Sequence, residues 1–216
     1  MKTAIVLASL LVGGLFAALW TCRWKIATWM MGLTAYHWTA RVILPRVRWR
    51  FRKPNLPAMT RITGWSKLRP GDFLLSRKRG YLNALLTPGY WKHAGLVLDN
   101  GFIAEMTANG FGLVSFDEFC HADRVAAFRC LDWDEEYIRK VVIPTCLSFE
   151  NKDYDDLFEL GVKALYCSEL IYESDPERRL DVNLSDLKGL GRQYVSPQDL
   201  AEIRNGQKVW NSEVSV

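Results

Sequence analysis

Two side chains that could perform nucleophilic chemistry stand at the edges of apolar runs. His93 precedes the apolar run at 94–98, whose composition is typical of a β-strand. Cys167 begins the segment Cys-Ser-Glu-Leu-Ile, in which Leu170 and Ile171 have the spacing of a core-facing helix side. An imidazole can accept the proton of a thiol, and a helix N-terminus favours the thiolate that results. The two motifs predict a cysteine nucleophile paired with a histidine base.

A third polar residue, Glu105, interrupts the apolar run at 102–106. The tight-turn signal at 99–101 would join this run to the preceding one as two antiparallel strands. Pairing outward from the turn places Glu105 opposite residue 95 or 96 and makes His93 its diagonal neighbour. A carboxylate in that position would hold the imidazole in one tautomer and stabilise its charged form. The residues alone leave open that Glu105 faces solvent on an edge strand.

The elements that must position these residues are strands first and helices afterwards. We expect strands at 73–75, 94–98, 102–106, 112–116 and 125–131, a short helix at 81–86 and a helical turn at 117–120. A helix is expected to begin near Asp134 and to break or bend at Pro144, and a later helix carries Cys167. This order predicts an α+β domain in which a largely antiparallel sheet packs against helices.

The composition predicts one folded domain with an appendage. Of the 216 residues, 49% are hydrophobic and 24% are charged, which is enough apolar material for a full core. We expect the domain to span residues 65–204 and residues 205–216 to form a loose tail. Cys120, Cys130 and Cys146 have no metal-ligand spacing and are interpreted as structural.

Residues 4–22 contain no charged side chain and are long enough for a helix to span a bilayer. The run ends in Leu-Trp-Thr-Cys-Arg, which lacks the small residues of a signal-peptide cleavage site. The sequence therefore predicts an uncleaved transmembrane anchor at 1–25. The following segment at 26–44 is less apolar and fits either a second, weaker span or an interfacial helix.

Cations and aromatic residues alternate at 46–53, a pattern that suits an anionic lipid surface. A solvated basic linker is the alternative, and nucleic acid is disfavoured because the run adjoins a membrane segment. We therefore expect residues 26–64 to be a membrane-proximal segment and linker. The positive-inside rule and five cysteines without framework spacing favour a cytoplasmic domain, with a periplasmic or extracellular domain as the alternative.

Several segments together resemble the permuted NlpC/P60 cysteine hydrolases of papain-like fold, and within them the YiiX/YebB-like branch. That family begins with a Pro-Gly-Asp strand, presents its histidine on the next strand and brings its cysteine last, on a helix. The same order occurs here and reverses that of ordinary papain-like enzymes. The resemblance covers about residues 65–202. It rests on residues 70–75, 93–97, 105, 112–114, 154–155, 158, 166–170 and 196–200.

The resemblance implies that Cys167 is the nucleophile, His93 the base and Glu105 the group that orients the base. Backbone N–H groups at the start of the cysteine helix would help to hold the oxyanion. We expect that neither a metal nor another cofactor takes part.

The resemblance also suggests residues that contact the substrate. Tyr154 resembles a family aromatic residue near the substrate cleft. Tyr166 and Ser168, on either side of the cysteine, are expected to contact the substrate as well. Glu169 is interpreted as a helix-surface or strand-capping contact.

These expectations combine into a membrane-anchored cysteine hydrolase or acyltransferase that cleaves an amide or ester bond through a thioester. The substrate would be a peptide or a lipid acyl group, and the membrane segment slightly favours the lipid. The bilayer is the expected partner besides the substrate, and the oligomeric state stays open. A catalytically silent scaffold or binding module of the same fold is the alternative, although the complete Cys-His-Glu set weighs against it.

Overall fold

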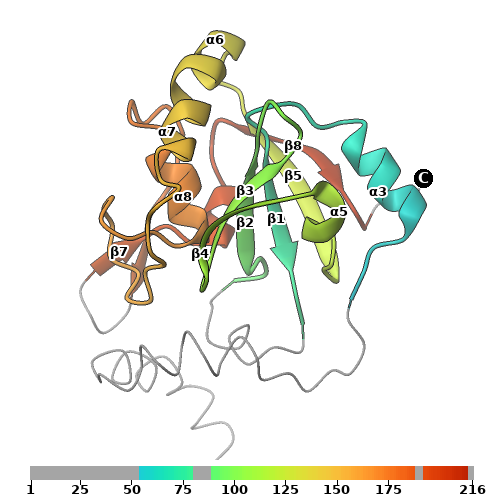
Figure 1. The fold of residues 1–216 in the computed structure, drawn as a ribbon, viewed down its shortest axis with the longest axis horizontal. Coiled ribbons are helices and arrows are strands. Elements are labelled where there is room, and N and C mark those ends of the chain that lie inside the picture. The colour runs from blue at the N-terminus through green and yellow to red at the C-terminus, as the bar shows by residue number, and fades with distance from the viewer. Residues whose placement is uncertain (1–53, 80–88, 188–191, 214–216) are drawn as a thin grey trace, which may run out of the picture.

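A six-stranded antiparallel sheet lies at the centre of the residues that the computed structural model describes, 54–79, 89–187 and 192–213. Its strand order is β4-β3-β2-β1-β5-β8 (Figure 1). The strands are β1 (Phe73–Arg77), β2 (His93–Val97), β3 (Ile103–Thr107), β4 (Gly110–Val114), β5 (Arg124–Cys130) and β8 (Gly206–Asn211). The first five match the expected strands to within two residues at either end, so the predicted α+β class with an antiparallel sheet is confirmed.

Helices cover both faces of this sheet (Figure 1). On one side lie α6 (Glu135–Tyr137), a π-helical segment (Ile138–Val142), α7 (Ile143–Leu147) and α8 (Cys167–Glu173), and on the other α3 (Ala58–Trp65) and α5 (Phe116–Phe119). The remaining elements are α9 (Pro197–Ala201) and a two-stranded sheet of β6 (Ser185–Leu187) and β7 (Arg192–Tyr194).

Because both faces are covered, the central strands are apolar on both sides. Phe73 and Leu75 of β1 belong to the core beneath α6–α8, whereas Leu74 belongs to the core beneath α5. All three side chains are fully buried. Continuous apolar runs therefore replace the alternating pattern of a sheet with one exposed face.

Several sequence predictions lie outside the described residues. These are the transmembrane anchor at 1–25, the membrane-proximal segment as far as residue 53 and the short helix at 81–86. Among the helices of the described residues, none combines the length and the apolar composition that crossing a membrane requires.

The Pro-Gly-Asp turn before β1 is held by a buried ion pair. Gly71 has a φ of +85°, and a Cβ added there would lie 2.7 Å from Cδ1 of Ile138, so the position requires glycine. The side chain of Asp72 is fully buried and accepts two hydrogen bonds from the Arg129 guanidinium, of 2.7 and 2.8 Å. This pair explains why an arginine interrupts the apolar strand β5.

The helical segment after Asp134 passes Pro144 without a break. Asp134 caps the segment, since its Oδ1 accepts a 2.8 Å hydrogen bond from the Tyr137 backbone N–H. A π-helical segment follows, and the backbone N–H of Ile143 donates to the carbonyl of Ile138. Pro144 lies in the first turn of α7, where its missing N–H is tolerated, so the helical path continues instead of breaking.

Both predicted domain boundaries need correction. The folded part already includes Leu56, which is buried and whose backbone N–H donates to the carbonyl of Cys120, and then the unpredicted helix α3. Residues 206–211, expected to lie in a loose tail, instead form the edge strand β8, which pairs with β5. Trp210 is the buried residue of that strand, and it packs against Gly64 of α3. A short polar strand with one anchoring aromatic residue carries little sequence signal.

Replacement of Asp72 by alanine should destabilise the fold by about 3–5 kcal/mol, because it leaves the largely buried Arg129 without its partner. Urea denaturation followed by tryptophan fluorescence would measure the change. The matched control is Glu136→Ala, which breaks the exposed pair with Lys140 and should change stability far less. Similar losses in both variants would contradict the structural role given to Asp72.

Candidate active site

Cys167 is the first residue of α8. The chain enters the helix from Tyr166, whose backbone is extended, with φ of −109° and ψ of 172°. The helix packs against β2 and β3, which brings its N-terminal residue to the sheet. Cys167 is a free cysteine and is 7% exposed, so its thiol lies almost entirely within the protein. The predicted position of the cysteine at a helix start is confirmed.

His93 and Glu105 meet on neighbouring strands. The register pairs Gly95 with Glu105, which makes His93 the diagonal neighbour that the turn geometry predicts. Nε2 of His93 lies 2.7 Å from Oε2 of Glu105. The side chains are only 17% and 14% exposed, so water screens their interaction weakly. The alternative of a solvent-facing glutamate is therefore wrong.

The Glu105 carboxylate and the Cys167 thiol raise the pKa of His93. Burial of the imidazole opposes its charge and lowers the pKa, but the negative charge of Glu105 and hydrogen bonds with Cys167 and Glu105 outweigh burial and bring the pKa to about 9. For Glu105, burial likewise acts to raise the pKa, yet the charge and hydrogen bond of His93, together with the charge of Lys78, lower it. Each residue therefore favours the charged form of the other.

The ring of His93 has one nitrogen for each neighbour. Nε2 is occupied by Glu105, so a bond between the ring and the thiol of Cys167 would use Nδ1. The imidazole also stacks on Phe119 of α5, with ring centroids 5.6 Å apart and an interplanar angle of 26°. The strand, the carboxylate and the aromatic ring thus orient the imidazole from three directions. Phe119 had no sequence signal, because α5 and β2 are neighbours only in the folded protein.

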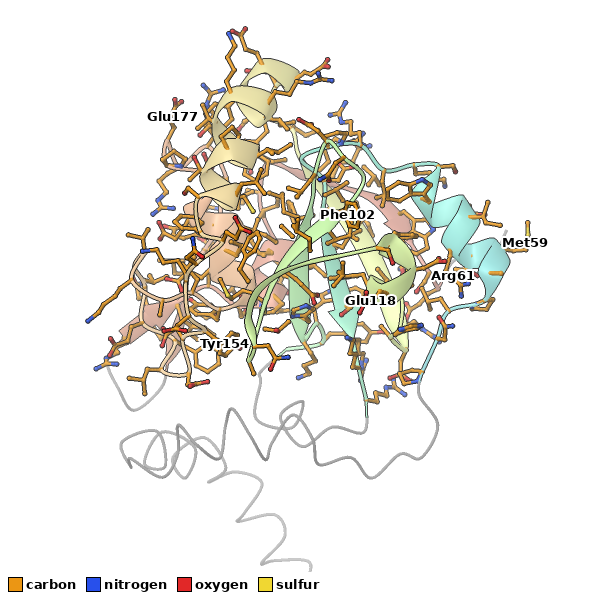
Figure 2. All side chains as sticks on the ribbon, viewed as in Figure 1. Met59, Arg61, Phe102, Glu118, Tyr154 and Glu177 are labelled. Atoms are coloured by element: carbon orange, nitrogen blue, oxygen red, sulfur yellow. The ribbon has the colours of Figure 1, made fainter. Side chains whose placement is uncertain are left out.

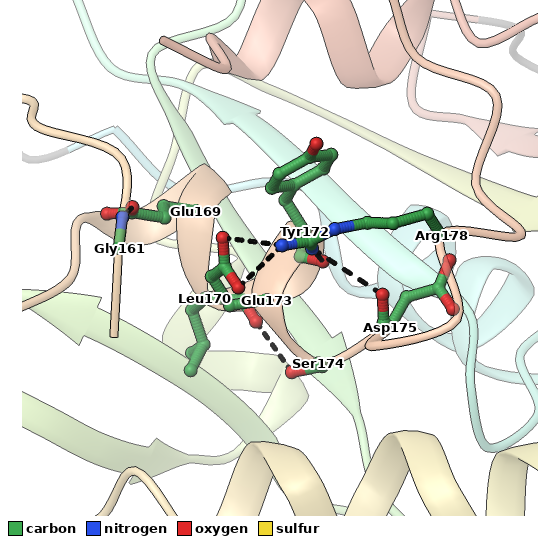
Figure 3. Close-up of polar contacts among 8 residues, drawn as sticks. All are labelled: Gly161, Glu169, Leu170, Tyr172, Glu173, Ser174, Asp175 and Arg178. Carbon is green, nitrogen blue, oxygen red and sulfur yellow. Dashed lines mark hydrogen bonds and ion pairs between the residues drawn. The ribbon is translucent and has the colours of Figure 1, made fainter.

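Glu169 fastens the N-terminus of α8 to the preceding loop. Its side chain is fully buried and accepts hydrogen bonds from the backbone N–H groups of Gly161, at 2.7 Å, and Tyr166, at 3.4 Å. Figure 3 includes Glu169 and Gly161 beside the helix. Burial raises the pKa of Glu169 to about 8, although the two N–H groups act to lower it. The residue caps the helix from inside the protein and does not lie on the helix surface as expected.

The other end of α8 is held by an arginine (Figure 3). Nη2 of Arg178 binds both carboxylate oxygens of Glu173, at 2.9 and 2.8 Å, and Nη1 donates to the carbonyl of Tyr172 at 2.6 Å. The hydroxyl of Ser174 donates to the carbonyl of Leu170 at 2.5 Å. These contacts add side-chain hydrogen bonds to carbonyls in the last turn of the helix. The short helix that carries the cysteine is therefore fastened at both ends.

Tyr166 and Ser168 also secure α8. The hydroxyl oxygen of Tyr166 accepts a 2.9 Å hydrogen bond from the backbone N–H of Val195, and the Ser168 hydroxyl donates to the carbonyl of Val195 at 2.8 Å. Tyr166 is 1% exposed, Ser168 is fully buried, and Phe158 packs edge-on against the tyrosine ring. This placement does not support the predicted substrate contacts of these two side chains.

Tyr154 lies in the segment that pairs with the residues before α8. It forms a parallel β-bridge with Leu165 and is partly buried against the core. Figure 2 labels it near the end of the molecule where the loop before α8 runs. Its predicted contact with substrate stays a prediction. Lys78, which the sequence argument missed, acts electrostatically on Glu105 from the position just after β1.

The remaining described cysteines are separate from this site. Cys120, Cys130 and Cys146 are buried, and burial raises the pKa of their thiols to about 12, 11 and 12. Thiols in such surroundings are unreactive, which agrees with a structural interpretation. Across the described residues, no three side chains of His, Cys, Asp or Glu are grouped as ligands for a metal ion.

The coupled pair predicts how stability depends on pH. The pKa of His93 rises on folding from 6.5 to about 9, so its stabilising contribution is complete below pH 6.5 and is lost as the pH rises through 9. In Glu105→Gln the carboxylate charge is absent, and this loss between pH 6.5 and 9 should shrink. Urea denaturation at several pH values would measure it. The control is His121→Gln, at an exposed histidine, which should keep the wild-type pH dependence. An unchanged profile in Glu105→Gln would contradict the coupling.

Comparison with known proteins finds a protein family to which most of the chain matches and a solved structure of similar fold. A family model described as permuted papain-like amidase enzyme, YaeF/YiiX, C92 family matches residues 67–214. The crystal structure of the metalloprotein yiiX from Escherichia coli O157:H7 is similar, with a TM-score of 0.57 and 17% identity, over 67% of this chain and 97% of that one. At that identity the likeness concerns the fold. No curated protein sequence matches significantly.

The matched region contains the strands, the helix α8, and Cys167, His93 and Glu105. It begins just before the Pro-Gly-Asp turn and includes β8, so the family match also covers residues expected to be a tail. It spans more than half of the chain. The chain therefore belongs to the YaeF/YiiX family, C92, of permuted papain-like amidases, and it is a cysteine hydrolase.

Proposed function

We propose that the protein is a membrane-anchored cysteine amidase in which Cys167, His93 and Glu105 form the catalytic triad. The observation that carries the proposal is the 2.7 Å contact between Glu105 and Nε2 of His93, whose other nitrogen is left for the thiol of Cys167. A thiol, a base and an orienting carboxylate in this order are the parts that nucleophilic catalysis by cysteine requires. The anchor is inferred from residues 4–22 of the sequence.

In this mechanism His93 moves each proton through Nδ1. Because the pKa of His93 is about 9, the imidazole already holds the thiol proton near neutral pH, and the thiolate of Cys167 attacks the carbonyl carbon of the amide. The proton then passes to the leaving amine as the C–N bond breaks, which leaves the acyl group on sulfur as a thioester. Water next gives a proton to His93 and its oxygen to the acyl carbon, and the C–S bond breaks to regenerate the thiol. Throughout, Glu105 balances the charge of the imidazolium.

The oxyanion formed at each addition step needs hydrogen-bond donors. Backbone N–H groups in the first turn of α8 point in the direction of the helix N-terminus, where Cys167 lies. They are the proposed donors, and they act without reorganisation because Glu169, Ser168 and Arg178 hold the helix in place.

The substrate class follows from the family and from the N-terminal segment. Amidase membership supports an amide in a peptide or a lipid, and an ester would react by the same steps with an alcohol as leaving group. The uncharged run at 4–22 and the cationic run at 46–53 favour a substrate at the bilayer, which slightly favours a lipid acyl group. An acceptor other than water at the second step would make the enzyme an acyltransferase.

Labelling with an iodoacetamide probe near pH 7 should modify Cys167 in the wild-type protein. His93→Ala should slow the labelling by about tenfold or more, because the thiolate loses its counter-ion. Mass spectrometry of the labelled peptide would measure the rate. Cys167→Ala shows the background, and His121→Ala, at an exposed position, should label as the wild type does. Equal rates in His93→Ala and the wild type would favour the catalytically silent scaffold.

Glu105→Gln should lower kcat by about 10- to 100-fold while KM changes little, since the glutamine keeps the shape but loses the charge that stabilises the imidazolium. Steady-state kinetics on an acyl-lipid or peptide amide found by screening would measure both constants. Glu118→Gln is the matched control, because that glutamate is exposed on α5 (Figure 2). A wild-type kcat in Glu105→Gln would remove Glu105 from the triad.

A further inference from the structure

We propose that the exposed apolar face of α3 docks on the bilayer in which the chain is anchored; this rests on the membrane anchor of the proposed function. Met59, Ile62 and Trp65 recur at every third position of the helix and are 70%, 62% and 43% exposed. We call these three residues the α3 stripe. Residues three apart lie on one side of a helix, so the stripe is a continuous, exposed apolar surface along α3.

Contacts of other residues of α3 hold the helix in an orientation that leaves the stripe exposed. Nε of Arg61 lies 2.9 Å from the carboxylate of Asp117, and Nη1 of Arg61 donates to the carbonyl of Leu56 at 2.6 Å. Gly64 lies against the ring of Trp210, where an added Cβ would come within 2.7 Å. Figure 2 shows Met59 projecting outward at the edge of the molecule. The side chain of Met59 is therefore exposed while α3 is packed on the domain.

The apolar surface continues beyond the helix. The ring of Trp65 packs against Phe116, with centroids 5.5 Å apart, and lies 3.5 Å from the position of a Cβ on Gly101. Next to that glycine, Phe102 is 45% exposed in the turn between β2 and β3. Large exposed apolar residues that gather in one place mark an interaction surface, whereas scattered ones do not.

The sequence before α3 identifies the occupant as lipid. Four residues separate the cationic and aromatic run at 46–53 from Ala58, and the uncharged run at 4–22 precedes it. The five steps from Lys53 to Ala58 span at most about 18 Å when extended, so α3 begins within that distance of a segment suited to anionic headgroups. An apolar stripe that directly follows such a segment is placed to lie at the same interface.

Cationic residues near the start of α3 complement an anionic surface. Leu56 is hydrogen-bonded to Cys120, and the backbone of Asp123 is hydrogen-bonded to that of Arg77. Arg77 is followed by Lys78 and Arg79, so these cations lie near the entry of the chain. His93 pairs with Ser76 one residue earlier on β1. The stripe extends from the chain entry to the β2–β3 turn at the other end of the sheet, where Trp65 lies, so docking through α3 would hold one side of the domain against the headgroups.

A fluorescent probe can test the depth of the stripe in the full chain. We would replace Cys22 by serine and Cys167 by alanine, introduce Ile62→Cys for a bimane label, and reconstitute the protein in vesicles of phosphatidylcholine and phosphatidylglycerol. The lipid carries a nitroxide quencher on its acyl chain. The matched control is Leu131→Cys, because Leu131 is 60% exposed, compared with 62% for Ile62, and lies at the end of β5. We expect quenching several-fold stronger at position 62 than at 131, and its loss when Met59→Asp is added.

Two readouts separate the possible failures. Flotation of the protein with the vesicles after an alkaline wash tests the anchor, and its loss would overturn the membrane part of the proposed function. Flotation with equally weak quenching at positions 62 and 131 would overturn the docking of α3 alone. A blue-shifted bimane emission at position 62 without lipid quenching would mean that protein covers the stripe, either a second copy or residues 1–53, and would also overturn lipid docking.

Discussion

The contact between His93 and Glu105 depends on the register between strands β2 and β3. A slip of one residue between β2 and β3 would turn one of the two side chains to the opposite face. Gly95, directly opposite Glu105, makes the arrangement possible, because a Cβ there would come within 2.9 Å of Cε2 of Phe119 and 2.6 Å of Cγ2 of Ile103. Without that side chain, Phe119 can approach the strand and stack on the imidazole.

Burying the charges of His93 and Glu105 costs free energy, and the protein offsets that cost by placing a hydrogen-bonding partner beside each buried charged group. Removing an ion from water costs several kcal/mol, which a close counter-ion and hydrogen bonds can recover. The pKa of His93, at about 9, means that its attraction to Glu105 and its hydrogen bonds outweigh burial. Elsewhere Arg129 plays the same part for Asp72, and Tyr137 donates a 2.5 Å hydrogen bond to the buried Asp175. Glu105, Asp72 and Asp175 therefore each have a side-chain partner close by.

How far the fold and the site could be predicted differs from element to element. Strands β1, β2, β3 and β5 were predictable because both faces of the sheet are covered there, so their apolar runs are long. The edge strand β8 was missed because it is mostly polar. The helix α3 was missed because its large apolar residues point outward. Glu105 was predictable from the turn at 99–101, which is local. The interpretation of Glu169 as a surface or strand contact was wrong, because its burial depends on a loop that returns to cover the helix.

The sequence by itself determined the residue types of the site, the order histidine before cysteine, and the strand pairing that joins His93 to Glu105. These features depend on short-range chemistry, in which a turn sets a register and a register sets a diagonal contact. The tertiary structure alone decided that α8 meets β2, that Phe119 stacks on the imidazole, and that Tyr166 and Ser168 serve the helix. Contacts of that kind join segments far apart in the chain, and no local pattern records which distant surface will cover a given side chain.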